Sequence, residues 1–378
     1  MKCTSPLVSV GIPTFNRANL LVKCLNSVLQ QSYENIEVIV SDNMSSDSTP
    51  DVCLEFMNQD QRVKTYRQTA NVKGVHNFDY VRRKSKGKYF MLLGDDDWID
   101  TELIQSCVQC LENNPDHIAA SGETYYYREN DVKFKGVSLS IQSDDPSERA
   151  INAIAEIIDG GTFYALYRAK PANEIPYLNA WGVDYFFICE AAFRGKITTL
   201  PDVACHRIDN SNRVSIKEVL HGKGIVDGQE LDPYGTIASV LFWRIVADGS
   251  VFKQIGYCDR YRFASDVVNT VNQRWPITGE ADLLNIADNL FTDQNLLEEY
   301  HSLLARVMSE WIIASNDATN SKWRSARQIL DVFIKLGFSS SNTRSEESRL
   351  LYKIIETSNA GNDLELKNDA YRILSLFI

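Results

Sequence analysis

Apolar and polar positions follow two different periods along the first hundred residues. Short continuous apolar runs alternate with longer stretches in which apolar residues recur every three or four positions. The first pattern is typical of a strand covered on both faces, and the second of an amphipathic helix. The predicted strands are Leu7–Ile12, Ile36–Val40, Val63–Tyr66 and Tyr89–Leu93. The predicted helices begin at Asn16 or Arg17, at Asp47 or Ser48, and at Phe78. Strands that alternate with helices predict a parallel sheet with helices on both faces.

The pattern is less regular over the next hundred residues. We expect Pro13 to end the first strand, because proline has no backbone N–H to donate. A Tyr-rich strand over Ile118–Arg128 precedes a polar loop, Asn130–Asp145. The other predicted elements are a helix over Pro146–Ile158, a strand over Phe163–Tyr167, a helix over Tyr185–Phe193, and strands over Ile197–Leu200 and Val203–His206.

Amphipathic helices dominate after about Ser215, and regular strands disappear. The predicted helices are Asp259–Asn272, Leu296–Ile312, Lys322–Leu336, Glu346–Ile355 and Leu364–Ile378. We therefore expect an α/β domain over residues 1–215 and an all-α domain over residues 216–378. The apolar stripes of these helices form an ordinary packed core, or else a helical module that binds an acceptor or forms a homo-oligomer.

The composition is that of an ordinary globular protein, with 44% hydrophobic and 24% charged residues in 378. A net charge of −11 argues against a nucleic-acid partner. The most apolar stretch, Ile237–Val246, is too short to span a bilayer and contains Arg244. No signal peptide is visible, and the eight cysteines are scattered. We expect a cytoplasmic protein without a transmembrane segment, and leave open a peripheral contact with the inner face of the membrane.

Three consecutive carboxylates, Asp95-Asp96-Asp97, follow the apolar strand Tyr89–Leu93. Open α/β sheets bind ligands at the carboxyl ends of their strands. Adjacent carboxylates repel one another unless a cation neutralises them, and hard oxygen ligands suit Mg²⁺ or Mn²⁺. The triplet therefore indicates a metal-diphosphate site. The competing interpretation is a solvated acidic turn that caps the following helix.

Two further strand ends lie at the same predicted edge of the sheet. The first strand leads into Pro13-Thr14-Phe15-Asn16-Arg17, and the second into Ser41-Asp42-Asn43. With the Asp triplet, these polar turns form a plausible cradle for a nucleotide. No Gly-x-Gly-x-x-Gly motif and no P-loop is present, which disfavours a dinucleotide site of the Rossmann kind.

The order of these motifs resembles the inverting family-two glycosyltransferases, which have a nucleotide-diphospho-sugar transferase (GT-A) fold. The resemblance covers roughly residues 5–215. It implies a GT-A Rossmann-like, mostly parallel sheet flanked by helices. The residues that carry it are Val8–Arg17, Glu37–Asn43, Asn71–Gly74, Gly87–Tyr89, Leu92–Asp97 and Gly182–Asp184.

The resemblance implies a role for each matching residue on the donor side. Thr14 and Asp42 match residues that hold the nucleotide base, and Pro13, Asn16, Asn71 and Gly74 belong to the same motifs. Arg17 either approaches the phosphates or pairs with an acid. Asp95, Asp96 and Asp97 match the family's Asp-x-Asp signature in an ambiguous register, with Asp97 or Asp96 favoured as the ligand of Mn²⁺ or Mg²⁺.

Asp184 matches the family's catalytic base, with a helix N-cap as the alternative role. Many members have a Glu before this residue, where this chain has Val183. Arg207 matches a cation that closes on the diphosphate. Its neighbour His206 is either a metal ligand or a structural histidine.

These implications predict an inverting, metal-dependent glycosyltransferase that uses manganese or magnesium. The donor would be a nucleotide diphosphate sugar, of the UDP or dTDP type. The acceptor would be a hydroxyl of a glycan, a lipid-linked molecule or a polyol phosphate, in cell-surface polysaccharide biosynthesis. The alternatives are a nucleotidyltransferase of the same fold and a non-catalytic scaffold built on the helical domain.

Overall fold

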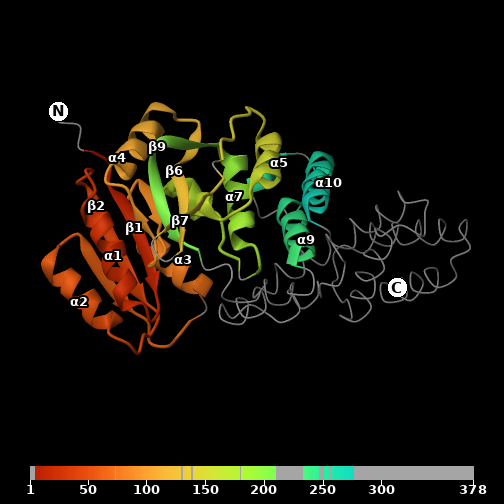
Figure 1. The fold of residues 1–378 in the computed structure, drawn as a ribbon. Helices are drawn as coiled ribbons and strands as arrows, with labels where there is room; N and C mark the ends of the chain where they lie inside the picture. Colours follow the sequence, from red (N-terminus) through yellow and green to blue (C-terminus); the bar gives the residue numbers. More distant parts are fainter. Residues whose placement is uncertain are drawn as a thin grey trace, which may run out of the picture.

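The computed structural model (Figure 1) describes residues 5–72, 74–128, 131–137, 139–178, 180–209, 233–246, 251–255 and 257–275. These residues form an α/β structure in which helices cover a curled sheet. No helix in this part of the chain combines the length and the apolar character needed to cross a membrane.

The described strands form one sheet in the order β3-β2-β1-β4-β8-β6-β9-β5, with β7 paired to β6. Strands β3, β2, β1 and β4 are parallel to one another, whereas β8 and β5 run antiparallel to their neighbours. The strands are β1 (Val8–Thr14), β2 (Ile36–Asp42), β3 (Val63–Arg67), β4 (Tyr89–Leu92), β5 (Trp98–Ile99), β6 (His117–Arg128), β7 (Asp131–Lys135), β8 (Leu166–Arg168) and β9 (Lys196–Ile208).

Helices cover both faces of this sheet, as the two periods of the sequence predict. Helices α1, α2 and α4 share one apolar core with β1, and α3, α5 and α7 share a second core on the other face. At Gly11 of β1, an added Cβ would lie 2.8 Å from Cγ2 of Val81, so glycine lets α3 approach the strand. The helices are α1 (Ala18–Leu29), α2 (Thr49–Gln59), α3 (Gly74–Lys84), α4 (Leu103–Asn113), α5 (Pro146–Glu156), α6 (Ala169–Asn173), α7 (Val183–Arg194), α9 (Pro233–Val246) and α10 (Tyr257–Arg274), with short 3-10 turns η1 (Gly161–Tyr164) and η2 (Val251–Gln254).

Strand β1 continues through Pro13 rather than ending before it. The carbonyl of Gly11 accepts from Leu93 N on the β4 side, and residues 11 and 13 of a strand present their backbone groups to the same side. Pairing with β4 ends at Gly11, whereas pairing with β2 runs on to Thr14. The missing N–H of Pro13 would face the β4 side of the strand, where β1 no longer has a partner, so no hydrogen bond between strands is lost.

The expected polar loop over Asn130–Asp145 contains a strand, β7, that forms a hairpin with β6. Its five residues, Asp131–Lys135, do alternate polar and apolar side chains, but the run is short and lies among polar residues, and pairing with the long β6 decides its conformation. The expected strand over Phe163–Tyr167 is wrong in its first half. Ala165 N donates to the Thr162 carbonyl, which closes the turn of η1, and β8 begins only at Leu166.

Two expected strands, Ile197–Leu200 and Val203–His206, are one long strand, β9. Its pairing with β6 shifts register between Gly122 and Glu123, which accommodates three extra residues of β9, residues 201–203. The two-residue strand β5 beside β9 was not predicted, because it is too short to carry a period.

Helices α9 and α10 pack against each other, α9 also against α7 and α10 also against α5 (Figure 1). Helix α10 confirms the helix expected over Asp259–Asn272. The expected helices over Leu296–Ile312, Lys322–Leu336, Glu346–Ile355 and Leu364–Ile378 lie outside the described residues.

Candidate active site

The carboxyl ends of β1 and β2 bring Thr14 and Asp42 side by side, because these residues are register partners. Both side chains are buried. Asp42 Oδ1 accepts a hydrogen bond from Ser45 N at 2.9 Å. Its other oxygen, Oδ2, and the Thr14 hydroxyl make no hydrogen bond of normal geometry within the described residues, and Arg67 Nε stays 3.6 Å from Oδ2. Buried polar atoms without partners are costly, so a ligand with an N–H group fits this position.

Two asparagines tie the neighbouring turns to this edge. Asn16 has a left-handed backbone (φ 53°), and its Oδ1 accepts from Ser46 N at 2.8 Å. Asn43 donates to the Asn71 side chain at 3.0 Å and to the Val72 carbonyl at 2.7 Å. Asn16 and Asn71 therefore hold the rim of the cradle. Of the other residues expected here, Pro13 is buried within β1, and Gly74 begins α3 with open space where its Cβ would stand.

The Asp triplet follows β4 and is folded inward. Asp95 and Asp97 are only 8% and 3% exposed. A Cβ added to Gly94 would lie 2.7 Å from Asp97 Oδ2 and 3.1 Å from Asp96 Oδ1, so both carboxylates bend back over this glycine. The next helix begins only at Leu103, with Glu102 at its N-cap. The triplet is thus neither solvated nor the cap of that helix.

Two arginines neutralise the triplet. Arg17 pairs with Asp96 and lies 3.6 Å from Asp95, and Arg207 Nε donates to Asp97 Oδ2 at 3.1 Å. The Arg207 guanidinium also lies 4.1 Å from the centroid of the Tyr164 ring. Burial acts to lower the pKa of Arg207, but the Asp97 carboxylate keeps this pKa well above its ordinary value.

Burial raises the pKa of both Asp95 and Asp97 to about 6, against the opposing effects of Arg17 and Arg207 respectively. At these two groups the native protein therefore binds more protons than the unfolded chain between about pH 4 and pH 6. Their contribution to the free energy of unfolding falls as the pH rises through this window, because the charged form is the one that burial penalises.

We expect Asp95→Asn to remove the Asp95 part of this pH dependence. In EDTA, the stability of the wild type relative to the variant should fall by about 2 kcal/mol between pH 4 and pH 6.5. Urea unfolding of both proteins across this range measures the difference. Asp202→Asn, at an exposed position of β9, is the matched control. Parallel stability curves for wild type and Asp95→Asn would contradict the raised pKa.

The triplet fits a divalent cation that arrives with a ligand. Within the described residues, the three carboxylates face two guanidinium groups, those of Arg17 and Arg207. Within the described residues, no three His, Cys, Asp or Glu side chains converge as a complete cage. Mg²⁺-type ions are commonly held by one or two carboxylates together with substrate phosphates, and Asp96 and Asp97 offer such oxygens.

The structure places His206 away from the triplet. His206 precedes Arg207 on β9, and successive residues of a strand point to opposite faces. Its Nε2 lies 2.8 Å from Asp100 Oδ1, and its Nδ1 lies 2.9 Å from the Tyr127 hydroxyl. His206 therefore has a structural setting on the far face, and does not meet the carboxylates with which we expected it to share a metal ion.

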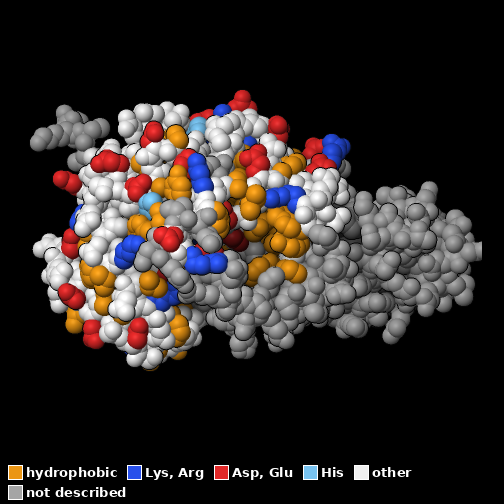
Figure 2. Space-filling view, in the orientation of Figure 1, with side chains coloured by type: hydrophobic (Ala, Val, Ile, Leu, Met, Phe, Trp, Pro, Cys, Tyr) orange, Lys and Arg blue, Asp and Glu red, His pale blue; other side chains and the backbone are white. Residues whose placement is uncertain are grey.

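Asp184 lies in the first turn of α7, where Gly182 occupies the N-cap with φ +85°. A Cβ at Gly160 would lie 2.8 Å from Asp184 Oδ2, so the carboxylate rests against that glycine. Burial raises the pKa of Tyr164 to about 12, opposed by Arg207 and reinforced by Asp97, Asp96 and Asp184. Tyr164 is thus near both the triplet and Asp184, which the fold brings into one region. Figure 2 shows a hollow at the centre of this face, with acidic atoms at its bottom and hydrophobic side chains toward α7 and α9.

Helices α9 and α10 hold the amino-terminal turn of α7 in place. Ile237 of α9 fills the space where a Cβ of Gly182 would stand, with Cγ1 2.5 Å from that position. Tyr185, next to Asp184, packs edge-on against Trp275 at 5.7 Å, and Trp275 stacks on Tyr234 at 4.7 Å. Residues beyond 230 therefore help to position the candidate base.

A buried ion pair fixes α9 to the middle of α7. Glu190 is 3% exposed, and it accepts from Arg194 at 3.0 Å and from Arg244 at 2.8 Å. Sequence reasoning missed this pair. Its signal was Arg244, the one charge of α9, and Glu190, the one charge of the apolar run Tyr185–Phe193 in α7. Of these only Arg244 was noticed, as an argument against a membrane span.

Replacing Arg244 with Met should lower the free energy of unfolding by about 1–3 kcal/mol, because Glu190 keeps only Arg194 as a cationic partner. Chemical denaturation measures this loss. The double variant Glu190→Gln/Arg244→Met should recover part of it, since no buried charge is then left short of a partner. A double variant that loses the sum of the two single losses would show that the pair is not coupled.

Comparison with known proteins shows which family and which fold this chain resembles. Residues 9–175 match the profile of Glycosyl transferase family 2. Glycosyltransferase GlyG of Streptococcus pneumoniae is 32% identical over 130 residues, which are 34% of this chain and 43% of that protein. A Campylobacter jejuni protein named GalNAc(5)-diNAcBac-PP-undecaprenol beta-1,3-glucosyltransferase is 26% identical over 168 residues, 43% of this chain and 52% of that one. The matches thus span about half or less of these relatives' own lengths.

Among solved structures, residues 1–349 of Staphylococcus aureus TarS in complex with UDP-GlcNAc superpose with a TM-score of 0.54 at 14% identity. The superposition covers 98% of this chain and 90% of that one. At this identity the likeness concerns the fold alone.

Proposed function

We propose that this protein is an inverting glycosyltransferase that uses a nucleotide diphosphate sugar, because residues 9–175 match the profile of Glycosyl transferase family 2. One observation carries the proposal. The unsatisfied atoms of Thr14 and Asp42, the arginine-paired triplet and the separate carboxylate of Asp184 occupy one region of the molecule. Such a transfer needs three groups of residues: one that binds the nucleotide base, one that binds the diphosphate, and a general base beside the acceptor.

The nucleotide base occupies the edge of the sheet at Thr14 and Asp42. Oδ2 of Asp42, which makes no hydrogen bond within the described residues, accepts one from a ring N–H, as a uracil or thymine provides. A UDP or dTDP sugar is therefore the donor we favour. Asn16 and Asn71 act on the donor through the turns that they hold together.

The diphosphate lies between Arg17 and Arg207. In the donor-free protein these guanidinium groups neutralise carboxylates, and a diphosphate competes for the same charges. Asp97 and Asp96 are the residues that would hold Mn²⁺ or Mg²⁺, and Asp95 completes the acidic set. When bound, the cation supplies positive charge that stabilises the departing diphosphate.

Asp184 accepts the proton of the attacking hydroxyl. Inversion at the sugar carbon requires the base and the leaving group on opposite sides of the reacting centre. Tyr164 contacts Arg207, the partner of Asp97, and its turn η1 follows Gly160, against which Asp184 rests, so Tyr164 lies near both sides. The transition state resembles an oxocarbenium ion, as in glycoside hydrolysis.

The acceptor is a hydroxyl of a glycan, a lipid-linked molecule or a polyol phosphate, in cell-surface polysaccharide biosynthesis. The name of the Campylobacter relative describes transfer to an undecaprenol-linked glycan, which supports a lipid-linked acceptor. With such an acceptor the enzyme works in the cytoplasm, at the inner face of the membrane. We assign acceptor binding or oligomerisation to a helical domain over residues 216–378.

Donor turnover tests this function. The purified protein is incubated with Mn²⁺ and a panel of nucleotide sugars, and the released nucleotide is identified. We expect nucleotide diphosphate from one donor, with loss of release in EDTA. Pyrophosphate would instead support a nucleotidyltransferase, which shares the α/β sheet. No binding or release with any donor would support the non-catalytic scaffold.

A further inference from the structure

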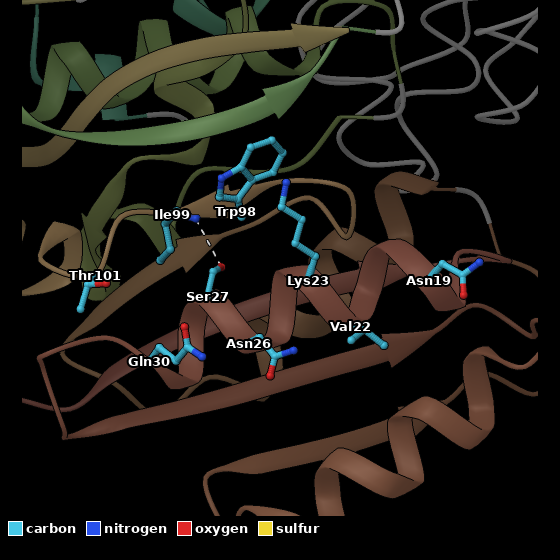
Figure 3. A pocket seen from close by; sticks show the side chains of 9 residues that line it. All are labelled: Asn19, Val22, Lys23, Asn26, Ser27, Gln30, Trp98, Ile99 and Thr101. Atoms are coloured by element: carbon cyan, nitrogen blue, oxygen red, sulfur yellow. Dashed lines mark hydrogen bonds between the residues drawn. The ribbon is translucent and has the colours of Figure 1, made fainter. Parts of the chain in front are cut away.

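A groove of about 480 Å³ lies on the surface between α1 and the β5 segment (Figure 3). One wall is a row of side chains of α1, and the other is formed by Trp98 and its neighbours. The polar and aromatic residues that matter here are Asn19, Lys23, Asn26, Gln30, Trp98 and Thr101. No acidic residue lines the groove, although the chain carries a net charge of −11.

Three amides and one ammonium group line up along α1. Asn19, Lys23, Asn26 and Gln30 are spaced by four, three and four residues, which puts them on one helix face. Within the described residues, no hydrogen bond or ion pair engages their side chains. An amide both donates and accepts, and this matches the hydroxyl groups of a sugar.

Lys23 rests on Trp98. Its Nζ lies 2.9 Å from the centroid of the indole ring, and Figure 3 shows the side chain reaching from α1 toward that ring. The indole also stacks on the His206 ring, with the ring centroids 5.3 Å apart, which fixes the orientation of the indole. A cation on an exposed aromatic ring is stabilised by only about 0.5–1 kcal/mol. An anionic ligand can therefore draw the ammonium group away and uncover the indole face.

The groove is separate from the candidate active site. Asp97 and Trp98 are adjacent in sequence, yet Asp97 pairs with Arg207 on one face and Trp98 stacks on His206 on the other. Ser27 Oγ accepts from Ile99 N at 3.3 Å and ties the base of the groove to α1.

We propose that this groove is a second, non-catalytic site for an anionic glycan. The amides of α1 bind sugar hydroxyls, the Lys23 ammonium binds a carboxylate or phosphate of the chain, and the indole of Trp98 packs against a sugar ring. The choice of a glycan rests on the proposed function, since a transferase that extends an acidic polymer gains from holding the polymer away from the reacting end.

Titration calorimetry of the full chain, without donor or cation, tests this site. The probes are a galacturonic acid hexamer, a glycerol phosphate hexamer and the neutral maltohexaose. We expect at least one acidic probe to bind about tenfold more tightly than maltohexaose, and the pair of acidic probes to show which anion is preferred. Lys23→Met should abolish the preference, and Asn26→Ala should weaken every probe.

Lys170→Met, at an exposed lysine of α6 outside the groove, is the matched control and should leave binding unchanged. Both lysines are exposed, so neither change threatens the fold. Equal affinity for acidic and neutral probes, no binding at millimolar concentrations, or an equal loss in Lys170→Met would each overturn the proposal.

The binding assay is independent of turnover. Lys23→Met should hydrolyse or transfer donor sugar at the wild-type rate, and a slower rate would overturn the separation of the two sites. Probe binding by a protein that turns over no donor would leave the groove standing while the proposed function fails. Donor turnover without probe binding would support the proposed function and overturn the proposed glycan site in the groove.

Discussion

Replacing Asp184 with Asn is expected to lower the rate of sugar transfer by a factor of about 10²–10⁴, the usual contribution of a general base. Donor affinity should stay unchanged, because the proposed donor contacts are made by Thr14, Asp42 and the arginine-paired triplet rather than by Asp184. The fold should persist, since Asn has the shape of Asp, and the charge of an acid in the first turn of a helix contributes roughly 0.3–1 kcal/mol. Transfer kinetics and donor titration measure the two effects separately.

The position of the Asp184 carboxylate is the reason to expect a lower transfer rate without a change in donor affinity or in the fold. Asp184 is not the N-cap of α7, because Gly182 occupies that position. Its side chain rests against Gly160, in the region that Tyr164 shares with the triplet. Asp202→Asn changes an exposed acid and should leave the rate unchanged. Wild-type transfer by Asp184→Asn would remove this residue from the mechanism, and a matching loss of donor affinity would move it to the donor side.

Replacing Asp97 with Asn should lower both stability and activity. Arg207 keeps its charge but loses its carboxylate partner, and breaking a buried pair typically costs about 3–5 kcal/mol. Turnover should fall by a factor on the order of 10²–10³, the effect of losing one electrostatic contact to the developing charge. Urea unfolding and donor turnover with varied Mn²⁺ measure these losses.

Asp96→Asn is the informative comparison. Its partner Arg17 has a side chain that is 40% exposed, so the stability loss should be within about 1 kcal/mol. The carboxylate whose removal weakens Mn²⁺ binding more is the principal ligand, which settles the register of the triplet. Unchanged Mn²⁺ affinity in both variants would exclude a metal site here.

Much of the fold was predictable because the periods of buried strands and amphipathic helices are visible in the order of apolar and polar residues. The runs Leu7–Ile12 and Ile36–Val40 predicted β1 and β2, and the positions after them predicted that Thr14 and Asp42 share an edge. Local rules failed where pairing overrides them. Pro13 stays within a strand because it lacks an N–H only on the side where β1 has no partner strand. Phe163 belongs to the 3-10 turn η1 instead of a strand.

Features of the candidate site also divide into those that the sequence determines and those that the tertiary structure decides. The sequence by itself determined the residue types and their order: the Asp triplet after an apolar strand, Asp184 at the start of a helix, and an amide-lysine face on α1. Only the tertiary structure decided which face of a strand each residue takes and which distant charges meet. Strand β9 sends Arg207 to Asp97 and His206 to Asp100, and α9 brings Arg244 to Glu190 across 54 positions of sequence. The physical reason is that periodicity records burial along one element, whereas the pairing of charges depends on how separate elements approach.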